Sequence, residues 1–240
     1  MSPRDEDADS VPPVAIEDDV PTFSEKLIGE LVGTFILTLA VACASAQKLP
    51  APAAPLSVAA ILIGLIYSFG PLSGAIFNPA VSVAFLLRNR MSHQTALSFA
   101  GVQTLGALLA GLVGAFIYGE SSVPIISDSS TPMGWLRASL AEILFTGTIV
   151  QAVLHCGTTR AQENNHVTGL AVGLVVFGCA VCSSISGSVF NPAIGTGLWI
   201  AKGLLRGGLS WAHILLYVFA PSVGAILSTG AFLATRPREP

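Results

Sequence analysis

The chain has 240 residues, of which 52% are apolar and only 10% are charged, and its formal net charge is −3. An average soluble domain has roughly 25% charged residues, so this composition excludes an ordinary water-soluble surface, and the small negative charge gives no basis for nucleic-acid binding. The sequence therefore predicts an all-α protein that crosses a lipid bilayer several times.

The N-terminal segment is acidic. Seven of the fourteen Asp and Glu residues fall in the first nineteen positions, which indicates a disordered tail over residues 1–24. This stretch lacks the basic start and apolar core of a secretory signal, so we expect the first hydrophobic segment to remain as a membrane anchor. A channel domain is then predicted over 25–235, in halves of about 25–118 and 136–235, followed by a short C-terminal tail at 236–240.

Six apolar segments are predicted to span the membrane. A helix rises 1.5 Å per residue, so about 20 apolar residues cross a hydrocarbon core of roughly 30 Å. In chain order the segments are approximately Leu27–Ala46, Leu56–Gly70, Gln94–Tyr118, Ala138–Leu154, Val167–Ile185 and Trp211–Ala234. The distribution of Lys and Arg favours cytoplasmic termini, with seven basic residues on that side and four on the other. The plasma membrane and an intracellular vacuolar membrane both remain open.

Two shorter apolar stretches, Asn78–Leu87 and Asn191–Lys202, have about half the length of a span. They predict re-entrant half-helices that reach the middle of the bilayer. The Gly- and Ser-rich segments that lead into them, 71–77 and 183–190, would place irregular backbone at membrane depth. Such backbone is tolerated only inside protein or beside a water-filled cavity, so these segments indicate a pore.

The two halves of the chain repeat each other. The octapeptide Ser73–Ala80 recurs at Ser186–Ala193 with six identical positions, 113 residues further along, and Glu30 recurs as Glu142 in nearly the same register. Each half has three spans, an odd number, so the second copy enters the membrane from the opposite side. The pattern predicts an inverted repeat whose matching elements meet at the midplane.

These features together resemble the aquaporin family, also called major intrinsic proteins, over roughly residues 25–235. The resemblance rests on six spans, two Asn-Pro-Ala (NPA) motifs and the paired glutamates. It implies a passive channel rather than an enzyme, a homotetramer with one pore in each subunit, and glutamates that accept hydrogen bonds from the backbone of the NPA loops. Unpaired polar groups at membrane depth would require the same partners for Glu30 and Glu142.

The NPA motif suits the start of a half-helix at a pore. Asparagine is a strong N-cap and proline is favoured at the first helical position. Two such helix starts that meet at mid-membrane would repel cations, because each N-terminus carries about half a positive charge. The asparagine amides could also donate to a passing water and break a proton-conducting chain. The predicted pore residues are Asn78, Pro79, Ala80, Asn191, Pro192 and Ala193.

The predicted selectivity filter differs from that of most relatives. Counted from the two asparagines, the filter positions are Val58, Cys179, Ser188 and Ile194. Most relatives have arginine where Ile194 stands, and the glycerol-conducting branch has aspartate soon after the second motif, where this chain has Gly195 and Thr196. We therefore expect a pore that is wider and less polar than a strict water channel. It would conduct water and a small neutral solute such as urea, ammonia, hydrogen peroxide or glycerol.

Two alternatives follow from the same residues. One is a channel that prefers glycerol, urea, ammonia or peroxide and has little selectivity for water. The other is a secondary transporter, a class in which inverted repeats are also common, although only Glu30 and Glu142 could serve as its coupling site. The four cysteines show no metal-binding spacing, so we expect no metal, no cofactor and no catalytic residue, and the partners are the permeating molecules and the lipid.

Overall fold

The computed structural model describes residues 20–50, 52–119 and 123–239. Most of the acidic segment predicted as a tail therefore lies outside the described residues. The first helix begins at Phe23, two residues inside that predicted tail. It starts there because Thr22 and Glu25 form a capping box, in which each side chain accepts a hydrogen bond from the other residue's backbone N–H.

The predicted all-α fold is confirmed. The described residues form eight α-helices and two short 3₁₀ turns, and they include no strand. In chain order the helices are α1 (Phe23–Ala46), α2 (Ala53–Ser73), α3 (Pro79–Leu87), α4 (His93–Tyr118), α5 (Pro132–Thr158), α6 (Thr168–Cys182), α7 (Pro192–Arg206) and α8 (Trp211–Thr235).

Five helices, α1, α2, α4, α5 and α8, are long and apolar enough to cross a membrane, whereas α6 has only 15 residues. At 1.5 Å per residue α6 covers about 22 Å, which is less than the span predicted for Val167–Ile185. It ends at Cys182 because the chain turns into the 3₁₀ segment Ser184–Ser186, which leads to the second NPA loop. The half-helix α7, in contrast, runs four residues past its predicted end at Lys202.

The two halves pack in the same way. Helix α1 lies against α4, and α5 lies against α8. A glycine allows close approach in each pair: a Cβ atom on Gly106 would lie 2.5 Å from the Leu31 carbonyl oxygen, and one on Gly224 would lie 2.2 Å from that of Ile143. Both distances are shorter than any real contact, so larger residues at these positions would force the helix backbones apart.

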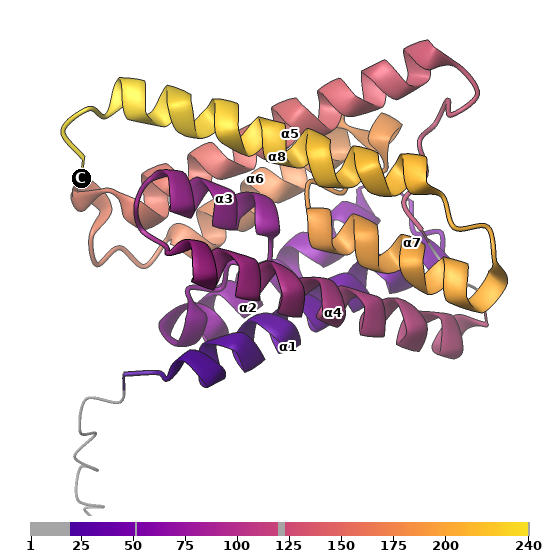
Figure 1. The fold of residues 1–240 in the computed structure, drawn as a ribbon, viewed down its shortest axis with the longest axis horizontal. Coiled ribbons are helices and arrows are strands. Elements are labelled where there is room, and N and C mark those ends of the chain that lie inside the picture. Colours follow the sequence, from indigo (N-terminus) through magenta and orange to yellow (C-terminus); the bar gives the residue numbers. More distant parts are fainter. Residues whose placement is uncertain (1–19, 51, 120–122, 240) are drawn as a thin grey trace, which may run out of the picture.

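The half-helices lie between α4 and α8. Figure 1 shows α3 and α7 one after the other along the long axis of the molecule, and both contact α4 and α8. Their N-termini, where the NPA motifs stand, therefore meet near the middle of the bundle.

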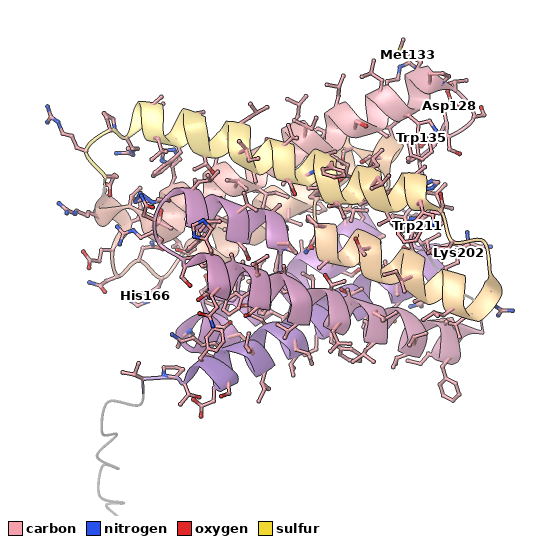
Figure 2. All side chains as sticks on the ribbon, in the orientation of Figure 1. Asp128, Met133, Trp135, His166, Lys202 and Trp211 are labelled. Atoms are coloured by element: carbon pink, nitrogen blue, oxygen red, sulfur yellow. The ribbon has the colours of Figure 1, made fainter. Side chains whose placement is uncertain are left out.

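The two ends of the bundle differ in their side chains. The start of α1 and the C-terminus lie at one end of the long axis (Figure 1). Figure 2 places His166 at that end and Trp135, Lys202 and Trp211 at the other. Tryptophans at the end of a bundle are typical of a membrane–water interface. The long axis is thus the axis along which the bundle would cross a membrane.

Candidate functional site

The two NPA loops share an unusual backbone. Gly74 and Gly187 have φ angles of 90° and 83°, and the next residues, Ala75 and Ser188, have 51° and 55°. Two residues later, Phe77 and Phe190 also adopt positive φ angles, of 49° and 51°. Left-handed backbone is uncommon for residues other than glycine and persists only where the surroundings hold it in place. The repeated octapeptide therefore encodes the same strained turn twice.

In the first loop, Glu30 holds this turn. Its carboxylate is fully buried and accepts hydrogen bonds from the N–H of Ile76 (3.0 Å), the N–H of Phe77 (2.7 Å) and the hydroxyl of Ser73 (2.6 Å). A fourth bond comes from the side-chain amide of Gln103 on α4, at 2.8 Å. The carboxylate thus accepts hydrogen bonds from loop N–H groups, which in a regular helix would have donated to backbone carbonyls.

The second loop repeats this arrangement with one difference. Glu142, also fully buried, accepts from the N–H of Val189 (3.0 Å), the N–H of Phe190 (2.6 Å) and the hydroxyl of Ser186 (2.7 Å). No amide from a neighbouring helix joins it among the described residues. Instead, the hydroxyl of Tyr217 on α8 donates to the Ser186 carbonyl at 2.7 Å. The serines repeated in the octapeptide could have predicted the two serine contacts. No feature of the sequence could have predicted the contact of Tyr217.

Each NPA asparagine joins its own helix to the opposite loop. The Asn78 side-chain oxygen accepts from the Ala80 N–H at 2.9 Å, and the Asn191 oxygen accepts from the Ala193 N–H at 3.0 Å. The side-chain amide of Asn78 donates to the Phe190 carbonyl, and that of Asn191 donates to the Phe77 carbonyl, at 2.9 and 2.8 Å. An amide NH2 has two hydrogens, so each asparagine keeps one N–H free for another acceptor. The prolines Pro79 and Pro192 occupy the first position of each helix.

The loop carbonyls are left without partners in the described part of the chain. The N–H groups of residues 74–77 and 187–190 all donate to the protein. The carbonyls of residues 74–76 and 187–189, in contrast, accept no hydrogen bond there. Gly74 is exposed and the other five residues are buried or half-buried, so these six oxygens are available to hydrogen-bond donors from outside the chain.

A cavity of about 420 Å³ lies beside these oxygens. It is lined by both loops, by Asn78 and Asn191, and by apolar side chains of α1, α2 and α6. It follows α6 from Thr168, its first residue, to Val181, which is next to its last. No charged side chain belongs to its lining among the described residues. The cavity is thus mostly apolar, and its polar groups come from the two loops, the NPA asparagines and the hydroxyl-bearing residues Ser45, Thr168, Ser184 and Ser188.

Three of the four predicted filter residues line this cavity. Val58, Ser188 and Ile194 do so, and Val58 and Ile194 also pack in one apolar cluster. Cys179 does not reach it: its side chain is 5% exposed, its sulfur lies 3.9 Å from the Phe145 carbonyl, and it packs beside Phe190.

The α6 residues that line the cavity follow a helical spacing. They include Thr168, Val172, Val176 and Ala180, at intervals of four. Residues four apart share one face of a helix, and the next residue is turned by about 100°. This spacing of four residues, which can be counted in the sequence, could have predicted that Ala180 lines the cavity and Cys179 does not. No group of three or more His, Cys, Asp and Glu side chains in the described segments could hold a metal ion.

Comparison with known proteins gives consistent matches. A family model described as "Major intrinsic protein" matches residues 17–232. A probable aquaporin of Arabidopsis thaliana is 30% identical over 226 residues, which cover 88% of this chain and 78% of that protein. A glycerol uptake facilitator-like protein of Lactiplantibacillus plantarum is 30% identical over 208 residues, or 85% of this chain and 94% of that protein. The X-ray structure of the aquaglyceroporin from Plasmodium falciparum has the same fold, with a TM-score of 0.73, 22% identity and coverage of 88% and 96%.

Proposed function

The chain belongs to the major intrinsic protein family, and we propose that within this family of channels it conducts water together with a small neutral solute. The observation that carries the proposal is the cavity, which combines apolar walls with a strip of unpaired carbonyls and has no charged lining among the described residues. A neutral solute can replace its hydrogen bonds to water by hydrogen bonds to these carbonyls, while its other side contacts apolar side chains.

Ions are excluded, in this proposal, by the NPA region. A cation that enters an apolar passage loses hydration that the strip cannot replace. It also meets the positive N-termini of α3 and α7, whose asparagines Asn78 and Asn191 present amide N–H groups. Water can accept from these amides with its oxygen, so its hydrogens point away from mid-pore in both directions. A continuous proton-conducting chain is then interrupted at that point.

The second solute is supported by the residues at the outer part of the cavity. Val58 and Ile194 are apolar and Ser188 is small, so these three filter positions bring no guanidinium and no aromatic ring to the cavity lining. We propose urea, glycerol, ammonia or hydrogen peroxide as candidates. The similarity to a glycerol uptake facilitator-like protein favours a second version of the function, a channel that prefers polyols over water.

A transporter coupled to an ion gradient is not supported. The two buried carboxylates in the long helices, Glu30 and Glu142, each accept from three donors at or beside the NPA loops, and Glu30 also accepts from Gln103 on α4. Neither is free to bind a coupling ion. The geometry thus favours passive flow.

We also propose cytoplasmic termini and a homotetramer. The shared location of the described ends of the chain (Figure 1) and the excess of Lys and Arg there support the orientation. The tetramer follows from the family resemblance, and the exposed apolar side chains of the long helices fit either lipid or a neighbouring subunit. Protease accessibility of the C-terminus in sealed vesicles and chemical cross-linking in the membrane would test the two statements.

Stopped-flow light scattering of proteoliposomes tests the function. We expect water and urea to equilibrate faster than in protein-free vesicles, with no increase in proton or sodium leak. A Val176→Trp variant should slow both because Val176 lines the cavity. The matched control is Leu174→Trp on the same helix, since Leu174 is 52% exposed on the outer surface. Equal rates in protein-containing and empty vesicles would contradict the proposal.

A further inference from the structure

The segment that follows α8 carries a glutamate that contacts a buried arginine. Arg88, the residue after α3, is 2% exposed, and its Nη2 atom lies 3.5 Å from the Oε2 atom of Glu239. The Arg88 guanidinium also donates to the hydroxyl and the carbonyl of Thr158 at the end of α5, at 2.9 and 2.7 Å. It lies over the ring of Phe232 on α8, 4.6 Å from the centroid. Arg88 therefore joins the ends of three helices, and Glu239 supplies the negative charge that a buried cation needs.

The second contact of Glu239 is with the loop between α5 and α6. Both of its carboxylate oxygens accept from the backbone N–H of Arg160, at 3.3 and 3.2 Å. Arg160 is the first residue of the 3₁₀ turn Arg160–Gln162 in that loop. One carboxylate thus connects the end of α3 to the loop that leads into α6, although these segments are far apart in the sequence.

Asn165 connects this loop to the cavity. Its side-chain amide donates to the carbonyl of Gln162, the last residue of the turn, and to that of Cys156 on α5. Its side-chain oxygen accepts from the N–H of Thr168 at 2.9 Å. Thr168 is the first residue of α6 and lines the cavity. The place of the turn therefore helps to fix a residue of the cavity wall.

The other partner of Glu239 also stands next to the cavity. Arg88 directly follows α3, on which Val81 and Phe85 line the cavity. Glu239 thus holds together two elements that border the cavity, α3 and the start of α6, at the end of the bundle where the C-terminus lies (Figure 1). None of the residues 159–167 belongs to the cavity lining. The loop therefore leaves this mouth of the cavity uncovered.

We propose that Glu239 acts as a latch, which holds the loop 159–167 away from this mouth and so keeps the channel open. The inference rests on the proposed function, because a latch requires a cavity that conducts. When Glu239 is removed, the Arg160 N–H and the Arg88 guanidinium lose a partner, and the loop becomes free to move toward the mouth. The device belongs to one end of the channel only. Ala201 stands where the repeat of 113 residues would place a second Arg88, and it has no charge.

Hydrogen–deuterium exchange of the full chain in detergent, followed by mass spectrometry, tests the contact itself. In Glu239→Ala the Arg160 amide should exchange about five-fold faster than in wild type, the factor that one hydrogen bond is worth. Glu239→Gln keeps an oxygen that can accept from Arg160 but has no charge for Arg88, so its rate should lie between the two. The matched control is Glu163→Ala, which removes an exposed carboxylate from the same loop and should leave the rate unchanged.

Stopped-flow water permeability of the same variants in proteoliposomes tests the effect on the channel. Glu239→Ala should conduct water more slowly than wild type, and by at most about five-fold, because the shift toward a closed loop cannot exceed the free energy of the lost contact. Glu163→Ala should conduct like wild type. Elution of each variant as a single species in gel filtration would show that it is folded.

The outcomes separate the latch from the proposed function. If Glu239→Ala speeds exchange at Arg160 but conducts water as fast as wild type or faster, the contact exists and the latch is wrong. If exchange at Arg160 is unchanged, Glu239 does not hold the loop, and the latch is again wrong. The proposed function stands in both cases. If the wild-type chain conducts water no faster than empty vesicles, the proposed function fails and the latch fails with it.

Discussion

Replacing Ile194 with arginine is expected to reduce urea and glycerol permeability by at least about tenfold while water permeability changes by no more than about two-fold. Ile194 lies in the third helical position of α7 and lines the cavity. An arginine there would fill part of the passage and add a fixed positive charge. A tenfold decrease requires only about 1.4 kcal/mol of additional barrier, which the loss of space for a molecule larger than water can provide.

The control for this prediction is Ile194→Met, which adds length without charge. If both variants block urea equally, the effect is steric. If only the arginine variant does so, the charge and its donors are responsible. Stopped-flow measurements with water, urea and glycerol on the three proteins would distinguish these cases. Undiminished urea flux through Ile194→Arg would show that this residue does not border the narrow part of the pore.

Replacing Glu142 with alanine should prevent the second NPA loop from forming. The change leaves the N–H groups of Val189 and Phe190 and the hydroxyl of Ser186 without their acceptor. Each unsatisfied buried group costs about 1–3 kcal/mol, so the sum of three reaches a large part of the 5–15 kcal/mol typical of a folded protein. We expect a much lower yield of folded protein in detergent, a lower melting temperature and no water conduction.

Glu142→Gln provides the comparison. Glutamine keeps one oxygen, which can still accept from Ser186 and Val189, and it loses only the bond to Phe190. Its melting temperature should therefore lie between those of wild type and Glu142→Ala. Thermal unfolding in detergent followed by intrinsic fluorescence would rank the three proteins. A Glu142→Ala variant as stable as wild type would show that water or another group can satisfy the loop.

The main features of the fold could be predicted from the sequence because they depend on length and repetition. Apolar segments of about 20 residues predict spans, shorter ones predict half-helices, and the repeated octapeptide predicts two matching loops. The end of α6 was predicted three residues too late, since Ile185 was counted with the apolar span although Ser183 and Ser184 separate it from Cys182. Hydropathy averages over isolated polar residues, whereas the helix ends where the backbone turns into the 3₁₀ segment Ser184–Ser186.

Details of the site depended on geometry that the sequence does not contain. Counting from Asn191 placed Cys179 in the filter, but the direction of a side chain changes by about 100° with each helical residue, and in the structure Ala180 lines the cavity. The hydroxyl of Tyr217, a residue of no recognisable motif, donates to the loop, and the hydroxyl of Ser188 donates to the Ala180 carbonyl of α6. They could be found only once the elements were placed in space.

The reciprocal bonds between each NPA asparagine and the opposite loop have a consequence for how the protein is made. The Asn78 amide donates to a carbonyl that stands 112 positions later in the chain. At the usual rates of translation, on the order of 5–20 residues per second, that acceptor emerges from the ribosome about ten seconds after its donor. During this interval the first half resides in the membrane with its central polar groups incomplete, and water or the insertion machinery must provide their partners. The centre of the pore is thus complete only after the second half has been synthesised and inserted.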